Sequence, residues 1–191
     1  MIIGITGSSG CGKTTALNTL QQLGALVLDC DAIYHRLLKE DAALLSAISN
    51  RFPDAVKGGV LDRPALAATV FSDPAALQDL NAITHTAVVK EVKKLLENAP
   101  VLAAIDAYGL FESGLNSLCD VTVAITAPEE MRVQRIVDRD QITAEKAKQR
   151  LAAQRPQEEL EALCDHTLRN DGTQQEFETK CLAFWKRLCI I

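Results

Sequence analysis

The sequence predicts an α/β fold in which helices cover a five-stranded parallel sheet. Two observations support this: short apolar runs recur along the chain, and helical patterns separate most of them. A third observation, that residues 31–98 contain no convincing strand, indicates an inserted subdomain. Alternating β and α segments are typical of parallel sheets. With 191 residues, 48% of them hydrophobic, the chain can form one main domain and an inserted subdomain. The apolar runs occupy residues 1–5, 25–28, 101–105, 121–125 and, weakly, 167–168.

Capping residues indicate where the helices of this fold begin and end. The helix that follows the first strand should stop at Gly24, because glycine favours helix C-termini. Thr126 to Glu129 forms a possible capping box ahead of a second helix, with Pro128 in its first turn. The last helix should open with the capping box Thr173 to Glu176 and close the core with an apolar stripe.

Residues 31–98 are expected to form a helical insertion, because a simple crossover needs far fewer residues. Asp73-Pro74 starts a long helical pattern, and Asp62-Arg63-Pro64 starts a shorter one. An insertion here would lie beside the carboxyl ends of the strands, where α/β sheets form a ligand crevice. The expected core comprises residues 1–30, 99–137 and 161–191, and residues 138–160 are expected to form a small helical lid.

Composition excludes several classes of partner. The net charge is −5, with 25 acidic and 20 basic side chains, so no global field would hold nucleic acid or an anionic membrane. The six cysteines lack metal-ligand spacing, as is typical of reduced cysteines in a cytosolic protein. The chain shows no leader pattern, and no apolar run approaches the ~18 residues of a membrane span. We therefore expect a cytoplasmic protein that binds neither nucleic acid nor membrane.

A glycine-rich stretch, GITGSSGCGKTT, carries the strongest functional signal. Gly7, four residues and Gly12-Lys13-Thr14 satisfy G-x-x-x-x-G-K-[ST], between a strand-like run and a helical pattern. Such a loop turns backbone N–H groups toward an anion, and the helix N-terminus adds its positive dipole. A flexible turn without function is the alternative, but the ordered strand, loop, lysine, hydroxyl and helix argue against it. The residues expected to cradle a nucleotide are Ser9, Gly10, Cys11, Gly12, Lys13, Thr14 and Thr15.

The same motif assigns chemistry to its last two residues. Lys13 would reach the β- and γ-phosphates of ATP or GTP as a point charge, and the Thr14 hydroxyl would be a ligand for Mg²⁺. Cys11 lies within the anion-binding loop, so its thiol could have a lowered pKa and react with oxidants. An inert thiol is the favoured interpretation.

Carboxylates follow two of the predicted strands. Asp31 comes shortly after the second strand and could accept the proton of an attacking hydroxyl or orient hydrated Mg²⁺. The alternative is that Asp31 only caps a helix. Asp106 ends the third strand in a four-apolar-then-acid pattern often found at a nucleotide's metal ion, so it could act on the metal through a water molecule or serve only the turn.

Arg132, Arg135 and Arg139 recur at i, i+3 and i+7, which places three guanidiniums on one helix face. Arg139-Asp140 stands where this helix should break, before Thr143 starts another. A mobile helix-turn-helix bearing arginine can close over ATP and stabilise the transferring phosphoryl group. We therefore expect Arg139 to contact phosphate, although solvated arginines would also explain the spacing.

These segments together resemble dephospho-coenzyme A kinases over essentially the whole chain. The phosphate loop alone would indicate only a nucleotide binder, whereas the complete ordered set is much more specific. The resemblance implies a P-loop kinase-like three-layer fold and transfer of the γ-phosphoryl of ATP to the ribose 3′-hydroxyl of dephospho-coenzyme A. The matching segments are GITGSSGCGKTT, LDCDAIYH, LDRPALAATVFSDP, ITH, LFESGL, RIVDRDQITAEKAKQRLAAQ and LRNDG.

The resemblance also implies roles for individual residues. Asp31 would be the base that faces the acceptor hydroxyl, and Arg139 would be the lid arginine. Lys13 would hold phosphates, with Mg²⁺ beside Thr14. The helical insertion would bind the acceptor, with Arg63 and His85 near it, although a lone histidine is more often an ordinary surface or core residue. Asn170 would lie by the adenine of ATP.

The chain departs from the family pattern in three places. GSSGCGKT replaces a common GGIGSGKS, Thr86 follows His85 where proline is usual, and Asp106 to Glu112, with Tyr108-Gly109, replaces a segment that usually has Pro-Leu-Leu before Phe-Glu. The last two changes concern the fit of the acceptor more than the reaction. The alternatives are a kinase for a nucleoside or sugar acid, and a nucleotide-dependent switch. A monomer or a small homo-oligomer is expected.

Overall fold

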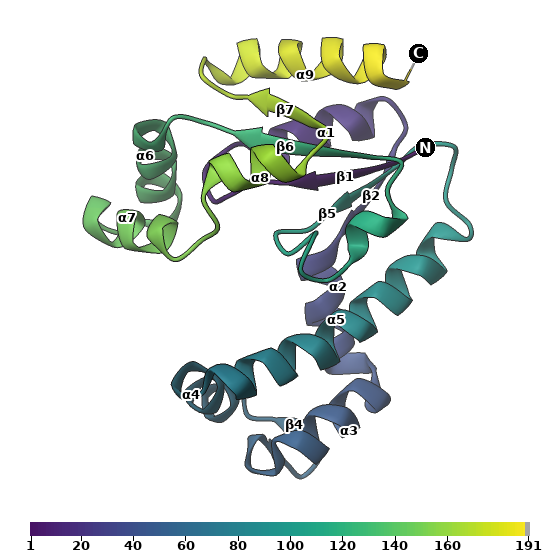
Figure 1. Ribbon diagram of the computed structural model, residues 1–191, viewed down its shortest axis with the longest axis vertical. Coiled ribbons are helices and arrows are strands. Elements are labelled where there is room, and N and C mark those ends of the chain that lie inside the picture. Colours follow the sequence, from purple (N-terminus) through teal and green to yellow (C-terminus); the bar gives the residue numbers. More distant parts are fainter. Residues whose placement is uncertain (190–191) are drawn as a thin grey trace. The chain divides into compact units, whose positions relative to one another are not determined.

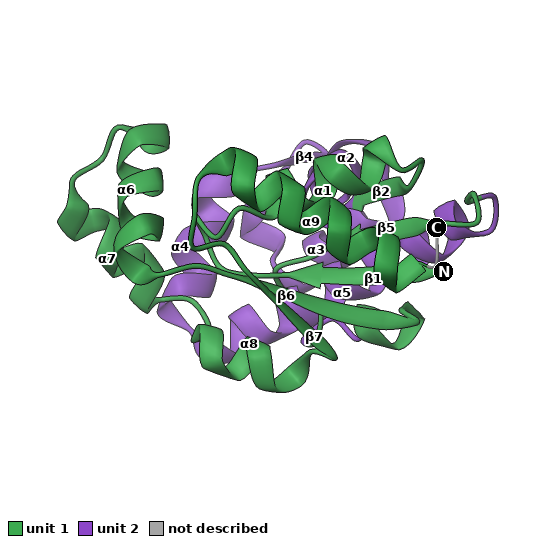
Figure 2. Ribbon diagram, turned by 90° about the horizontal axis from the view of Figure 1, so that it is seen from above, with its two compact units in different colours: residues 1–28, 99–111, 115–191 green, residues 29–98, 112–114 purple. Residues whose placement is uncertain are grey.

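The computed structural model describes residues 1–189 (Figure 1). The chain divides into two compact units, which Figure 2 shows in two colours. Unit 1 comprises residues 1–28, 99–111 and 115–191, and unit 2 comprises residues 29–98 and 112–114. The last two residues of unit 1, which also end the core predicted at 161–191, lie outside the described residues. Within the described part, no helix is long and apolar enough to cross a membrane.

The main sheet has the strand order β2-β5-β1-β6-β7. β1 pairs in parallel with both β5 and β6, and β6 pairs in parallel with β7. The predicted five-stranded α/β fold is therefore confirmed, with strand ends shifted by a residue or two. The strands are β1 (Ile2–Thr6), β2 (Leu26–Asp29), β5 (Ala103–Asp106), β6 (Val121–Thr126) and β7 (His166–Arg169).

Helices cover both faces of the sheet in unit 1. α1 (Lys13–Gln22) and α9 (Gln174–Cys189) lie on one face, and α8 (Gln157–Leu163) lies on the other (Figures 1 and 2). Alternation along β1 explains the arrangement, because the side chains of Ile3 and Ile5 enter the core beneath α1 and α9 while Gly4 faces the opposite way. A Cβ on Gly4 would lie 2.7 Å from the sulfur of Cys119, so any larger residue would require the Cys119 side chain to move.

The end of α1 and the start of α9 both agree with the predictions. α1 ends just before Gly24, which has φ +85°. At the start of α9, the Thr173 hydroxyl accepts a hydrogen bond from the Glu176 N–H, and the Glu176 carboxylate accepts one from the Thr173 N–H. This reciprocal pair is the predicted capping box. Trp185 is fully buried, and its Nε1 donates to the Ala16 carbonyl of α1, which ties the two helices together.

The capping box predicted at Thr126 to Glu129 is wrong. Thr126 is still part of β6, and its carbonyl accepts a hydrogen bond from the Asn170 N–H. α6 (Glu129–Asp140) begins after Pro128, which occupies the N-cap position with φ −53° and makes no side-chain cap. The negative charges of Glu129 and Glu130 in the first turn interact favourably with the helix dipole instead.

Unit 2 contains helices that begin at aspartate caps. Asp62 caps α4 and Asp73 caps α5, as predicted. One row of side chains along α5, spaced four residues apart, is buried: Ala76, Leu80, Thr84, Val88 and Val92. The helical elements of this unit are α2 (Cys30–Glu40), α3 (Ala42–Arg51), η1 (Pro53–Ala55), α4 (Arg63–Ser72) and α5 (Pro74–Leu96).

The expectation that residues 31–98 contain no strand is wrong. β3 (Val56–Lys57) and β4 (Val60–Leu61) pair as a small antiparallel hairpin. Gly58 and Gly59 connect them with φ +58° and +78°, the left-handed conformations that a two-residue hairpin turn requires. Strands of two residues are too short to produce a periodic pattern, so the glycine pair was the only local signal.

Candidate functional site

The phosphate loop, residues 7–12, connects β1 to α1 in unit 1 and needs its glycines for two reasons. Gly10 and Gly12 have φ +76° and +99°, in the left-handed region. Neighbouring atoms also leave no room for a side chain, because a Cβ on Gly10 would lie 2.7 Å from the Arg132 carbonyl oxygen and one on Gly12 would lie 2.3 Å from Asn170 Nδ2. Gly10 and Gly12 are thus required both for their left-handed backbone conformation and for the close approach of neighbouring atoms.

Side chains from distant segments hold the first part of the phosphate loop. Arg132 of α6 donates from Nη1 to the Ser8 hydroxyl over 2.7 Å. Gln154 makes two hydrogen bonds to Ser9: its Oε1 accepts from the Ser9 N–H, and its Nε2 donates to the Ser9 hydroxyl, each over 2.9 Å. The N–H and the hydroxyl of Ser9, which was predicted to touch the nucleotide, therefore both have protein partners.

The second part of the phosphate loop is held through its carbonyls. Arg135 donates from Nη1 to the Gly10 carbonyl over 3.1 Å and from Nη2 to Asn170 Oδ1 over 3.2 Å. Asn170, which is 4% exposed, donates from Nδ2 to the Cys11 carbonyl over 2.9 Å. Asn170 was predicted to lie by adenine, and the structure places its side chain against the loop backbone.

Lys13 and Asp106 come together at the carboxyl end of the sheet, where Nζ lies 3.2 Å from Oδ1. The side chains are only 21% and 17% exposed, so the amine is held in a partly desolvated position at the start of α1. Thr14 is the next residue of that helix. Its hydroxyl and the Asp106 carboxylate are hard oxygen donors of the kind that suits Mg²⁺. Among the described residues no cluster of three or more His, Cys, Asp or Glu could form an all-protein metal cage.

Cys11 does not have the environment of a reactive thiol. Its side chain is buried at 1% exposure, and this burial raises the thiol pKa even though the Lys13 charge and N–H act in the opposite direction. The alternative of a lowered pKa is therefore wrong. The helix N-terminus that was expected to lower the pKa is outweighed by the loss of water around the sulfur.

Arg139 lies in the helical hairpin formed by α6 and α7 (Ala144–Ala152), which we call the lid hairpin because it overlaps the lid expected at residues 138–160. Its guanidinium donates to the Asp140 carboxylate from Nε over 2.7 Å and from Nη2 over 3.0 Å. Arg150 of α7 pairs with the same carboxylate. Hydrogen bonds from Arg139 and then Arg150 lower the Asp140 pKa to about 2. The hairpin breaks at Gln141, with φ +52°.

The predicted arginine face contacts the phosphate loop through the two arginines that were not expected to contact phosphate. Arg132 and Arg135 bind the phosphate loop, whereas Arg139 pairs with its neighbour Asp140. The regular spacing was the available signal for the first two. Gln154 was not singled out, although it is the last residue of the matching segment RIVDRDQITAEKAKQRLAAQ.

In unit 2, Asp31 lies exposed in the first turn of α2. The cap of this helix is Asp29, whose Oδ1 accepts a hydrogen bond from the Ala32 N–H over 2.9 Å. The alternative that Asp31 only caps the helix is therefore wrong. Tyr34, one turn further along α2, was not among the residues predicted for the site. Burial raises the pKa of its hydroxyl, and the nearby charge of Arg63 acts in the opposite direction.

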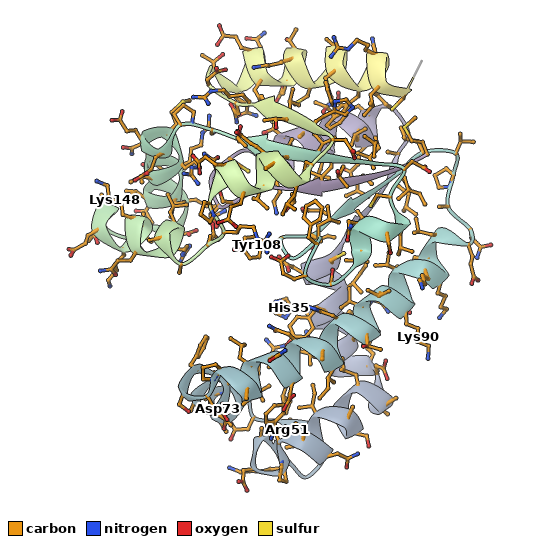
Figure 3. The ribbon with its side chains drawn as sticks, viewed as in Figure 1. His35, Arg51, Asp73, Lys90, Tyr108 and Lys148 are labelled. Carbon is orange, nitrogen blue, oxygen red and sulfur yellow. The ribbon has the colours of Figure 1, made fainter. Side chains whose placement is uncertain are left out.

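His85 lies on α5 of unit 2. It lines a groove of about 990 Å³ along α5, together with Lys90, Lys93 and Glu112 (Lys90 is labelled in Figure 3). Among the described residues that line this groove, neither Asp31 nor Arg63 is found. Of the three residues predicted to bind the acceptor, His85 lines this groove.

The strand order and the glycine loop with its lysine and threonine define the class of P-loop small-molecule kinases. A shikimate kinase structure from Acinetobacter baumannii has the same fold (TM-score 0.56, 16% identity, covering 99% of this chain and 93% of that one). A family model described as dephospho-CoA kinase matches residues 1–176. The chain therefore belongs to the dephospho-CoA kinase family.

Individual relatives agree with this assignment. A dephospho-CoA kinase of Thermus thermophilus is 38% identical over 93% of this chain and 87% of its own length, and that of Deinococcus radiodurans is 37% identical over 97% and 91%. A solved structure from Thermus thermophilus gives a TM-score of 0.82 at 35% identity, covering 100% and 97% of the two chains. Dephospho-CoA kinase from Campylobacter jejuni gives 0.69 at 27%, covering 98% and 96%.

Proposed function

We propose that this protein transfers the γ-phosphoryl group of ATP to the ribose 3′-hydroxyl of dephospho-coenzyme A, giving coenzyme A and ADP. The observation that carries the proposal is the Lys13–Asp106 pair beside the phosphate loop, in a chain of the dephospho-CoA kinase family. Phosphoryl transfer of this kind depends on positioning and on electrostatic stabilisation of the transferring group. A lysine held at the loop mouth provides both.

In this proposal the loop amides and Lys13 hold the phosphates of ATP. The Thr14 hydroxyl would be a ligand for Mg²⁺, and Asp106 would act on the ion through a water molecule. When bound, Mg²⁺ would supply positive charge that offsets the negative charge of the ATP phosphates. Asp106 would also keep the Lys13 amine oriented before the nucleotide arrives, since the two groups lie 3.2 Å apart.

Asp31 would act as the general base on the acceptor. Its carboxylate would take the proton of the 3′-hydroxyl as the new oxygen–phosphorus bond forms and the bond between the γ-phosphorus and ADP breaks. Because Asp29 already caps α2, the helix does not require Asp31 for its own stability. Arg63 and His85 would hold anionic or polar groups of the acceptor, within an insertion at residues 31–98.

The lid hairpin would supply the remaining charge. Arg139 would leave Asp140 and approach the γ-phosphate, while Arg150 keeps the Asp140 carboxylate paired. The lid is proposed to span residues 138–160, and Asn170 would add an adenine contact to the loop contact already seen. The cytoplasm remains the expected compartment.

The test is an assay with purified protein, ATP, Mg²⁺ and dephospho-coenzyme A, in which chromatography and mass spectrometry follow coenzyme A. Parallel reactions offer a nucleoside or a sugar acid as acceptor, and Lys13→Ala serves as the inactive control. We expect coenzyme A from the unsubstituted protein alone. Folded protein that forms no coenzyme A, or that prefers another acceptor, would refute the proposal.

A further inference from the structure

We propose that Gln154 is a positioning residue for ATP binding, which holds Ser9 of the phosphate loop and links this loop to the end of the lid hairpin. Its effect on catalysis rests on the proposed function, but its effect on the loop itself does not. Gln154 was not among the residues that the sequence singled out.

The contact between the two residues fixes Ser9 at two points. Gln154 Oε1 accepts from the Ser9 N–H and Gln154 Nε2 donates to the Ser9 hydroxyl, so one carboxamide satisfies both the backbone and the side chain. Two bonds between the same pair restrict orientation as well as distance. Ser9 stands between Gly7 and Gly10, where the chain has most freedom of rotation. A contact at this point therefore orders the most flexible part of the loop.

The segment that carries Gln154 is itself anchored on both sides. The Arg155 N–H donates to the Tyr108 hydroxyl over 2.9 Å (Tyr108 is labelled in Figure 3). Gln157 makes a reciprocal pair with Ala127, accepting from its N–H over 2.9 Å and donating to its carbonyl over 3.0 Å. Residues 154–157 are thus fixed firmly enough for Gln154 to position another residue.

The place of these anchors links the lid hairpin to the loop. Ala127 lies just before α6, Gln154 lies just after α7, and Gln157 is the first residue of α8. The two ends of the hairpin are therefore tied to each other through Gln157 and to the loop through Gln154. A movement of the hairpin that displaced its exit would reach Ser9 through a single side chain.

The geometry separates Gln154 from residues that contact the substrate. Its amide already satisfies the Ser9 N–H and hydroxyl, so it acts on the nucleotide through the loop. Loss of the contact should leave the loop less ordered before ATP binds, and bound phosphates should then restore its order. We therefore expect the KM for ATP to rise about tenfold, the scale of one net hydrogen bond, with kcat changed less than about twofold.

The experiment compares Gln154→Ala, Gln154→Asn and Ser9→Ala with Gln149→Ala, an exposed glutamine on α7, as the control. Hydrogen exchange of peptides covering residues 7–12 is measured on the free protein, affinity is measured with a non-hydrolysable ATP analogue, and KM and kcat follow in the coenzyme A assay. The asparagine variant keeps the amide but is one methylene shorter, so it should resemble the alanine variant. A Ser9→Ala/Gln154→Ala double variant should lose less than the sum of the single losses.

Faster loop exchange and weaker ATP-analogue binding in both Gln154 variants, but not in Gln149→Ala, would support the proposal. Unchanged exchange and affinity, or a loss confined to kcat, would overturn it. Should one variant fail to fold, Ser9→Ala and the remaining Gln154 variant still decide. Exchange and analogue binding need no acceptor, so protein that passes these tests yet makes no coenzyme A would refute the proposed function and leave the role of Gln154 standing.

Discussion

Replacing Gly12, where the phosphate loop joins α1, by alanine should destabilise unit 1. Gly12 has φ +99°, and the new Cβ would lie 2.3 Å from Asn170 Nδ2. Asn170 cannot easily move away, since it is 4% exposed and is bonded to the Cys11 carbonyl and to Arg135. The substitution therefore combines backbone strain with a collision.

The size of the effect follows from these two contributions. A non-glycine residue held in the left-handed region costs about 1–3 kcal/mol. Displacing Asn170 from the Cys11 carbonyl removes a buried hydrogen bond that contributes about 0.5–1.5 kcal/mol. Together they should lower the free energy of unfolding of unit 1 by about 2–4 kcal/mol. At a typical denaturant dependence, the unfolding midpoint should fall by about 1–2 M urea.

Trp185 provides the assay, because it is the single tryptophan of the sequence and is fully buried in unit 1. Its indole donates to the Ala16 carbonyl of α1, the helix that follows Gly12. Tryptophan fluorescence during urea unfolding therefore reports on the unit that carries the substitution. Loss of ATP-analogue binding should accompany the loss of stability, since the loop conformation itself is changed.

Gly24→Ala is the matched control. Gly24 also has a left-handed conformation, φ +85°, but no atom lies within 4 Å of the position that its Cβ would take. It should show the backbone contribution alone, so the difference between the two variants measures the collision with Asn170. If Gly12→Ala proves no more destabilising than Gly24→Ala, the collision argument is wrong.

Four further predictions concern separate residues. Asp29→Ala should lower the stability of α2 by about 1 kcal/mol through loss of its cap, whereas Asp31→Asn should spare stability and lower turnover about 10²-fold or more; urea unfolding and steady-state kinetics check both, and full turnover in Asp31→Asn contradicts the second. The Asp140 pKa is lowered from 3.8 to about 2, so its stabilising ion pairs are complete above pH 3.8 and lost as the pH falls toward 2; NMR titration of its carboxyl should show this, and an ordinary pKa would contradict it. Cys11 should resist iodoacetamide at pH 8 in native protein and react after denaturation, as peptide mass analysis can show; rapid native labelling would contradict its burial.

Local patterns predicted the parts of the fold that local chemistry decides. The apolar runs, the glycine loop and the aspartate caps at Asp62 and Asp73 each act within a few residues, and the structure contains them. Predictions that depended on where a strand ends were less secure. Thr126 failed as a cap because β6 continues through it, and Asp29 caps α2 because β2 ends there. A shift of one or two residues decides which side chain faces the helix terminus.

Contacts across long sequence separations could not be predicted in the same way. Ser9 and Gln154 are 145 positions apart, and Cys11 and Asn170 are 159 apart. No periodic pattern in the sequence relates the two residues of such a pair, because the strand order and the path of the lid hairpin bring them together. The spacing of the arginines on α6 correctly predicted that they share one helix face. Which of these arginines contacts the phosphate loop depends on where the helix starts relative to β6.

The phosphate loop illustrates why such distant contacts are needed. Its glycines allow the left-handed turns, but the same freedom makes the unbound loop adopt many conformations, and ordering them opposes nucleotide binding. Its own backbone supplies only one short-range bond within residues 7–12, from the Cys11 N–H to the Ser8 carbonyl. Order must therefore come from side chains outside the loop, and Arg132, Arg135 and Gln154 belong to the lid hairpin or its exit. Substitutions at the base of the hairpin should consequently appear first as weaker ATP binding, before they affect the chemical step.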